Sequence, residues 1–127
     1  MTHTLQSLLR EYARLPDWLG DAPKSATARN RYGNHPLDTA AVRGILDEVA
    51  LLLSHGADIH AQGEHQYTAL HSAVEQGHIH VVEFLIEQGA DLFSTTEDGM
   101  TPLELAEALE ENIIAKTLCA HMKNQSP

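Results

Sequence analysis

Histidines gather in the middle of the chain, and such clusters can bind zinc or supply general acids and bases. His65 precedes the segment TALHSAVEQGHIHVVEFLIEQGAD, which contains His71, His78 and His80. A zinc site needs about four converging ligands. His78 and His80 are two residues apart, so on a helix they point to different sides. We therefore expect no metal site and no bound cofactor.

Other catalytic arrangements are also missing from the sequence. It has no glycine-rich phosphate loop, no nucleophile elbow and no His-Glu-x-x-His motif. Glu110 and Glu111 are adjacent in sequence, so their carboxylates diverge around a helix. The single cysteine, Cys119, excludes an internal disulfide and a cysteine zinc cage. We do not expect an enzyme.

The composition favours one helical domain. The chain has 127 residues, 43% of them apolar, which is enough for a single modest core. Leu, Ala, Ile and Val predominate over aromatic residues, as is typical of packed helices. The N-terminus MTHTLQSLLREY lacks the pattern of an export signal, and no apolar run reaches the roughly 20 residues that span a bilayer. We expect a soluble cytoplasmic protein that is monomeric when free.

The distribution of charged side chains limits the classes of partner that the protein can bind. Residues 1–43 carry six basic and four acidic side chains, a net charge of +2, whereas the rest carries fourteen acidic and two basic ones, a net charge of −12. A surface of this kind repels phosphate backbones and anionic lipids and attracts basic proteins. We expect a protein partner with a basic surface, and no binding to nucleic acid or membranes.

The histidine segment belongs to an internal repeat. HPLDTAAVRGILDEVALLLSHGAD begins at His35, TALHSAVEQGHIHVVEFLIEQGAD at Thr68 and TPLELAEALEENIIAKTLCAHM at Thr101, so each begins 33 residues after the last. Thr101 is a favourable N-cap, and Pro102 fits the first helical position. Each unit then shows two apolar stripes at helical spacing, which glycine separates in the first two units. One unit cannot bury both stripes alone, so the units must stack.

This pattern, with its T-P-L-H-x-A opening, resembles the ankyrin repeat over residues 33–121. The resemblance implies an all-α solenoid of three helix-turn-helix repeats with an N-terminal capping helix. The single domain would comprise a cap helix (1–15), a linker loop (16–32), repeat 1 (33–65), repeat 2 (66–98) and a C-terminal capping repeat with its tail (99–127). His35 replaces the capping Thr and Ala69 the Pro, which should weaken the helix starts. Glu110 replaces the glycine between helices, as suits a repeat that faces water.

The segment before the repeats leaves one question open. Leu5, Leu8, Leu9 and Tyr12 predict an amphipathic cap helix from about Thr4 to Leu15. The linker that follows contains the only tryptophan, Trp18, and an irregular loop of that length is often functional. Trp18 either packs against the cap helix or takes part in binding.

The resemblance also assigns roles to residues. His71 matches the T-P-L-H histidine and His78 the Gly-His before the second helix, so both are interpreted as structural, whereas His55, His60, His65 and His80 are interpreted as solvated. Partners of ankyrin repeats usually bind the concave side. By position, the partner-binding residues would be Arg31, Tyr32, Asn34, Val42, Arg43, Glu64, His65, Tyr67, Glu75, Gln76, Glu97, Asp98, Met100 and Leu109. The alternative for the tyrosines is packing on the neighbouring turn.

Three functional hypotheses follow. The first is a free-standing protein-binding module that blocks a basic partner, because short acidic ankyrin proteins resemble some bacterial immunity proteins and antitoxins. The second is a scaffold or adaptor subunit of a larger assembly. The third is a protein that responds to a small molecule or metal through its loop histidines.

Overall fold

A computed structural model describes residues 4–125, so residues 1–3 and 126–127 of the predicted cap and tail lie outside the described residues. The predicted all-helical class is confirmed, because the described part contains helices and no strand. The α-helices are α1 (Leu5–Tyr12), α2 (Pro36–Arg43), α3 (Leu46–Ser54), α4 (Ala69–Glu75), α5 (Ile79–Glu87), α6 (Pro102–Ala108) and α7 (Asn112–Gln125). Two short 3-10 helices, η1 (Pro16–Trp18) and η2 (Glu64–Gln66), lie between them.

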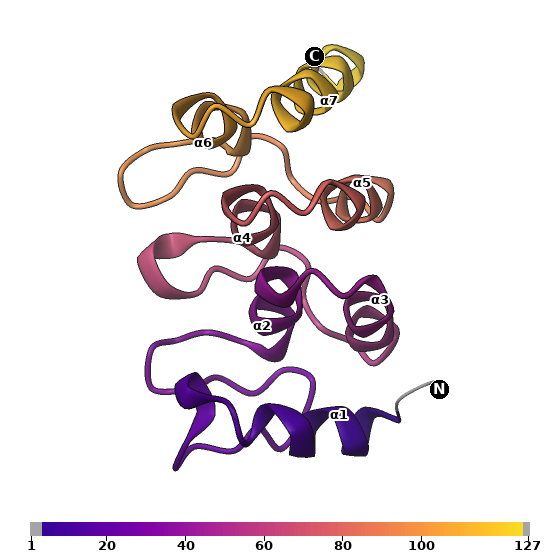
Figure 1. The fold of residues 1–127 in the computed structure, drawn as a ribbon, viewed down its shortest axis with the longest axis vertical. Helices are drawn as coiled ribbons and strands as arrows, with labels where there is room; N and C mark the ends of the chain where they lie inside the picture. Colours follow the sequence, from indigo (N-terminus) through magenta and orange to yellow (C-terminus); the bar gives the residue numbers. More distant parts are fainter. Residues whose placement is uncertain (1–3, 126–127) are drawn as a thin grey trace.

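The helices form a stack of antiparallel pairs. Helices α2, α4 and α6 make an inner row, α3, α5 and α7 an outer row, and α1 covers the end beside α2 and α3 (Figure 1). Ala40, Ala73 and Ala106 occupy the same place in the three inner helices and have no exposed surface. Side chains this small let successive helices approach closely, so the repeat period determines the stacking.

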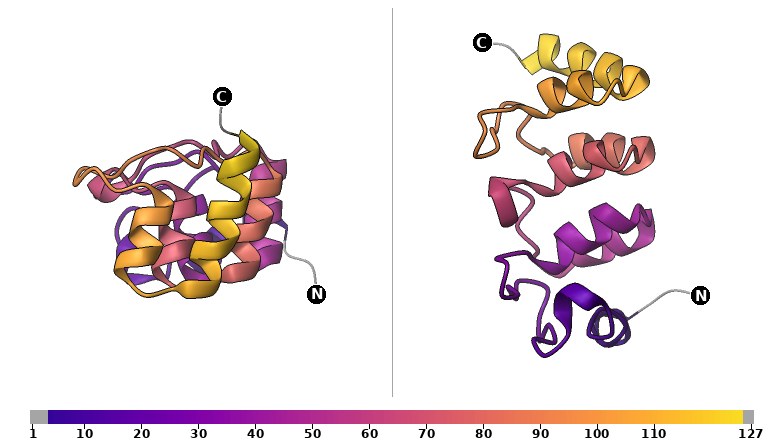
Figure 2. Two further views of the ribbon diagram at one scale, coloured as in Figure 1. Left: turned by 90° about the horizontal axis from the view of Figure 1, so that it is seen from above. Right: turned by 60° about the vertical axis from the view of Figure 1, so that its left-hand side comes forward.

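Each inner helix is preceded by a loop that projects to one side of the stack (Figure 2). Three turns recur in these loops at the same period: tip 1 (residues 30–34), tip 2 (63–67) and tip 3 (96–100). Each is closed by a hydrogen bond from its first backbone N–H to its last carbonyl, at 2.9, 2.8 and 3.0 Å respectively. The tips and the inner helices together form the concave side.

Capping side chains explain where the inner helices begin. Thr68 and Thr101 each accept a hydrogen bond from the backbone N–H three residues later, as N-caps do. Where His35 replaces threonine, the Asp38 carboxylate instead accepts from the His35 backbone N–H at 2.8 Å. The predicted weakening of this helix start is therefore opposed by Asp38.

The cap region differs from the prediction in the length of its helix, and it decides between the two alternatives for Trp18. Helix α1 ends at Tyr12, not near Leu15, and Thr4 is its N-cap. The linker is ordered, because Trp18 is fully buried and its indole N–H donates to the Thr39 hydroxyl at 2.8 Å. The packing alternative therefore holds for Trp18, with a partner on α2.

The turn between the paired helices shows why Glu110 can replace glycine. Gly44, Gly77 and Glu110 all have a positive φ, at 74°, 75° and 59°. A Cβ added at Gly44 would lie 2.5 Å from the His78 ring, and one at Gly77 would lie 2.7 Å from the Glu111 carboxylate. Glu110 belongs to the last pair of the stack, and its side chain is exposed. A side chain at position 110 therefore strains the backbone but does not clash with a following repeat.

Glu110→Gly is expected to raise the free energy of unfolding by roughly 0.5–1 kcal/mol. Relief of the left-handed strain outweighs the greater entropy of glycine in the unfolded chain. Urea unfolding followed by far-UV circular dichroism measures the change, and Gly44→Ala should change stability in the opposite direction. A less stable Glu110→Gly protein would mean that the glutamate side chain makes a favourable contact.

Candidate functional site

A concavity of the described residues lies between the tips and the inner helices. It is a groove of about 430 Å³, and its walls come from the end of the cap region, tips 1 and 2, and helices α2 and α4. The lining residues are Leu15, Pro16, Asp17, Asn34, Asp38, Thr39, Val42, Arg43, Glu64, His65, Tyr67, Ser72 and Glu75. Its lining combines apolar side chains, among them Leu15, Val42 and Tyr67, with charged ones.

The groove brings together about half of the residues that the sequence assigned to partner binding. Those present are Asn34, Val42, Arg43, Glu64, His65, Tyr67 and Glu75. Those that do not line it are Arg31, Tyr32, Gln76, Glu97, Asp98, Met100 and Leu109. The sequence reading missed the wall formed by Leu15, Pro16 and Asp17, which has no counterpart in the other repeats.

Two missed residues carried a signal in the sequence. Thr39 and Ser72 are equivalent positions in repeats 1 and 2, and each lies three residues before a predicted groove residue, Val42 and Glu75. Residues three apart share one face of a helix. That spacing would have placed both hydroxyl groups in the groove.

Tyr67 lines the groove at the junction of tip 2 and α4. Its hydroxyl donates a hydrogen bond to the Glu75 carboxylate at 2.9 Å, and its ring lies against that of His71, with centroids 5.5 Å apart. Partial burial, and then the hydrogen bond with Glu75, raise the pKa of Tyr67 to about 12. The ring is thus half-buried, neutral and held in one orientation.

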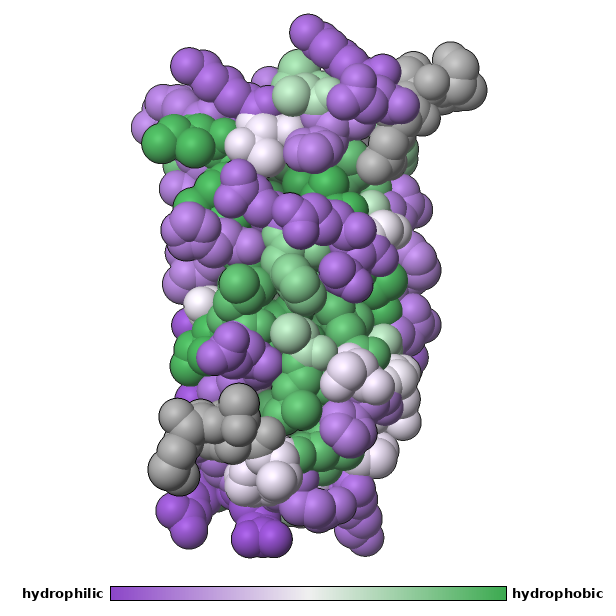
Figure 3. All heavy atoms as spheres, turned by 90° about the vertical axis from the view of Figure 1, so that its right-hand side faces the viewer, coloured by the Kyte–Doolittle hydropathy of each residue, from purple (hydrophilic) through white to green (hydrophobic). Residues whose placement is uncertain are grey.

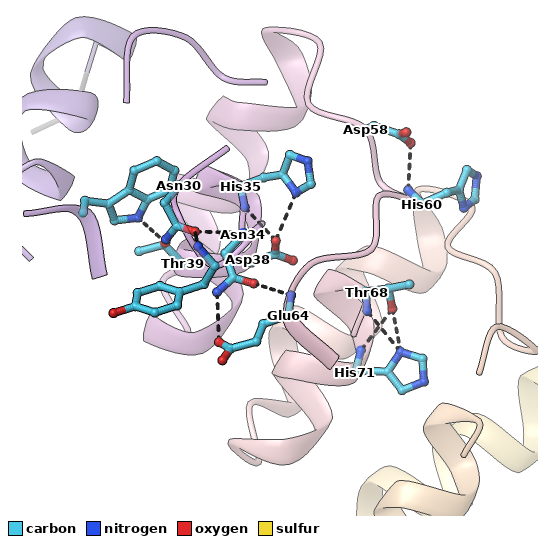
Figure 4. A network of polar contacts seen from close by, with 12 residues as sticks. Asn30, Asn34, His35, Asp38, Thr39, Asp58, His60, Glu64, Thr68 and His71 are labelled. Atoms are coloured by element: carbon cyan, nitrogen blue, oxygen red, sulfur yellow. Dashed lines mark hydrogen bonds and ion pairs between the residues drawn. The ribbon is translucent and has the colours of Figure 1, made fainter. Parts of the chain in front are cut away.

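Side-chain contacts connect the tips to one another. The Asn34 side chain of tip 1 accepts from the Glu64 backbone N–H at 2.8 Å (Figure 4). His65 of tip 2 pairs with the Glu97 carboxylate of tip 3, which raises the His65 pKa. The predicted residues Asn34, Glu64, His65 and Glu97 therefore hold the rim of the groove together. The interpretation of His65 as merely solvated misses this pairing.

Arg43 and Arg31, both predicted to bind a partner, each make bonds within the chain. Arg43 donates to the buried Glu48 carboxylate at 3.1 Å and also pairs with Glu11. The Tyr12 hydroxyl donates to the same Glu48 carboxylate at 2.6 Å. Arg31 donates to the Leu19 carbonyl and so restrains the linker. Alignment to the repeat motif does not reveal these bonds, because Glu11 and Leu19 lie outside the motif and the motif does not specify a carboxylate at Glu48.

The two histidines interpreted as structural both join successive repeats. The Thr68 backbone N–H donates to His71 Nδ1 at 3.2 Å (Figure 4), so Nε2 carries the proton and donates to the Met100 carbonyl at 3.0 Å. Burial lowers the His71 pKa, which keeps the ring neutral. His78 Nε2 lies 2.9 Å from the Val42 carbonyl of the preceding repeat. Across residues 4–125, no three metal-binding side chains of the His, Cys, Asp or Glu type converge.

His71→Ala is expected to cost about 1–3 kcal/mol, because it leaves the Thr68 N–H and the Met100 carbonyl without their buried partner. The matched control is His80→Ala on α5, whose side chain is 85% exposed, and it should stay within about 0.5 kcal/mol of wild type. Urea unfolding followed by circular dichroism compares the two. Equal losses would mean that His71 contributes nothing through its hydrogen bonds.

The outer helices form a second surface on which a partner could bind, apart from the groove. Apolar side chains cluster in the middle of this face, and polar side chains dominate its ends (Figure 3). Leu51, Leu53 and Phe84 are partly buried against the core, whereas Ile113 at the start of α7 is 73% exposed. None of the helices within the described part of the chain has the length and apolar character to cross a bilayer.

Comparison with known proteins gives one consistent result. A family model for the ankyrin repeat matches residues 32–64, and a model for multiple ankyrin repeats matches residues 52–106. The chain is 41% identical over 69 residues to human protein phosphatase 1 regulatory subunit 27, covering 54% of this chain and 45% of that protein. It is 40% identical over 90 residues to mouse ankyrin repeat and SAM domain-containing protein 6, covering 70% of this chain and 10% of that protein.

A third relative is alpha-latrocrustotoxin-Lt1a of Latrodectus tredecimguttatus, which is 32% identical over 96 residues, covering 75% of this chain and 7% of the toxin. The chain thus spans less than half the length of each of these three relatives, all of which are eukaryotic proteins.

Proposed function

Since this chain belongs to the ankyrin-repeat family, whose repeats are protein–protein interaction modules, we propose that it binds a basic protein partner in its concave groove. The observation that carries the proposal is the groove itself, where Val42 and Tyr67 line the same hollow as the carboxylates of Asp17, Glu64 and Glu75. An apolar centre with a charged rim is the usual arrangement of a protein interface. The surplus of acidic residues supplies the complementary charge.

The simplest function of such a module is to bind its partner and block the surface that it covers. An inhibitor of a basic protein, of the kind represented by immunity proteins and antitoxins, would need only to cover the partner's charged surface. The rim made by the tips suits this role, because contacts between successive tips hold the Glu64 backbone and the Glu97 carboxylate in place before binding. A cytoplasmic location remains part of this proposal.

A second candidate is a regulatory or scaffold subunit. The similarity to protein phosphatase 1 regulatory subunit 27 over 69 residues favours it, since that protein's name describes a subunit of an assembly. The two candidates differ in what the partner does when bound. A blocker abolishes the partner's activity, whereas a regulatory subunit leaves or redirects it.

Capture from native extract followed by mass spectrometry identifies the partner and permits the test of the groove. Tyr67→Ala is expected to weaken binding by about 2 kcal/mol, mainly through faster dissociation, because a half-buried aromatic ring at an interface centre behaves as a hot spot. Surface plasmon resonance measures both rate constants. Circular dichroism of the variant must first show the wild-type helix content.

The double change Glu83→Ala and Glu87→Ala serves as the control, because it removes two exposed carboxylates from α5 on the outer row. It should alter dissociation far less than Tyr67→Ala. A larger effect of this pair would place the partner on the outer face and contradict the proposed function.

A further inference from the structure

The groove carries more negative than positive charge at its surface. Four carboxylates line it, those of Asp17, Asp38, Glu64 and Glu75, against one guanidinium, that of Arg43. The Arg43 charge is already balanced by Glu48 and Glu11, and Asp38 is buried against His35. Asp17, Glu64 and Glu75 are exposed. Glu64 also lies 3.7 Å from the His65 ring, so the unbalanced negative charge around the opening comes chiefly from Asp17 and Glu75.

An aromatic ring lies directly beside this charge. The Tyr67 hydroxyl binds Glu75 Oε2, and one side of the Tyr67 ring is occupied by His71. A guanidinium is attracted both to an aromatic face and to carboxylates, with which it forms two parallel hydrogen bonds. A lysine ammonium has no planar fork and is more strongly hydrated, so it gains less from the same surroundings.

We propose that the groove binds an arginine side chain that projects from an extended segment of the partner. The guanidinium lies against Tyr67 and bonds to the Glu75 and Glu64 carboxylates. The methylene stem and a neighbouring apolar residue contact Val42 and the Leu15–Pro16 wall. This inference rests on the proposed function, because it names the chemistry that the concave groove selects.

Nuclear magnetic resonance titration of the whole protein tests the inference with two small probes, N-acetyl-arginine N-methylamide and N-acetyl-lysine N-methylamide. The arginine probe should shift the backbone amides of Val42, Tyr67 and Glu75 in a saturable way. It should bind about fivefold or more tightly than the lysine probe, because only the guanidinium forms the paired hydrogen bonds. Absence of saturable shifts, shifts centred on α6 and α7, or equal affinities would each overturn the inference.

Glu75→Gln should weaken the arginine probe about tenfold, since it replaces a charged acceptor by a neutral one of the same shape. Glu83→Gln, an equal change on the outer row, should leave the affinity unchanged. An equal effect of the two variants would reduce the binding to nonspecific attraction and overturn the inference.

The test separates the inference from the proposed function. If Tyr67→Ala prevents capture of the native partner and the arginine probe does not bind, the groove is the interface and the arginine assignment is wrong. If the probe occupies the groove and Tyr67→Ala leaves partner capture unchanged, the groove accepts a guanidinium but the partner binds elsewhere, and the proposed function is wrong.

Discussion

Replacing Glu48 by alanine is expected to lower the free energy of unfolding by about 3–5 kcal/mol, the usual cost of breaking a buried ion pair. Glu48 is only 2% exposed and accepts hydrogen bonds from Arg43 on α2 and from Tyr12 on α1. Its loss leaves the Arg43 charge partly buried and the Tyr12 hydroxyl without an acceptor. The cap helix and the first repeat lose their polar connection together.

Asp47→Ala is the matched control for this change. Asp47 precedes Glu48 in the first turn of α3, and its side chain is exposed. Its removal should cost only the helix-dipole contribution, about 0.3–1 kcal/mol. Guanidinium unfolding curves followed by circular dichroism give both values. Similar losses for the two variants would show that the buried pair has no special importance.

Trp18→Ala is expected to destabilise the protein by about 3–5 kcal/mol, as truncations of large buried aromatic side chains do. The indole has no exposed surface, and its N–H is bonded to Thr39. The truncation leaves a cavity between the linker and α2 and removes the partner of the Thr39 hydroxyl. Because the groove wall of Leu15, Pro16 and Asp17 adjoins Trp18, partner binding should weaken as well.

The neighbouring residue provides the comparison. Leu19 is 56% exposed, so Leu19→Ala should change stability by no more than about 0.5 kcal/mol. Thermal unfolding monitored by circular dichroism suits both variants, since one of them has lost the fluorophore. If Leu19→Ala were the more damaging change, the packing role assigned to Trp18 would be wrong.

The period of 33 residues was sufficient to predict the helical stack. Ala40, Ala73 and Ala106 recur in phase, so the sequence alone identifies which faces touch. The interpretation of His71 as a buried link also came from its place in the motif. The burial of positions that recur with the period is predictable, because equivalent positions make the same packing contact in every repeat.

Most of the contacts that the sequence did not predict involve the cap region or a residue type that is not repeated. Glu48 lies on the apolar face of α3, four residues before the buried Leu52, yet no local pattern specifies that its partners are Arg43 and Tyr12. The linker similarly has no equivalent, so the wall that Leu15, Pro16 and Asp17 add to the groove was not foreseen. Contacts between the cap and the repeats depend on tertiary structure alone.

The burial of Trp18 at the α1 end also determines which part of the molecule tryptophan fluorescence reports on. It is the only tryptophan in the chain, and the helix pairs contact mainly their neighbours in the stack. Loosening of α6 and α7 would leave the surroundings of the indole unchanged, so tryptophan fluorescence monitors one end of the molecule. Far-UV circular dichroism instead averages over all the helices. Unfolding curves from the two signals would coincide for an all-or-none transition and separate if the repeats open one after another.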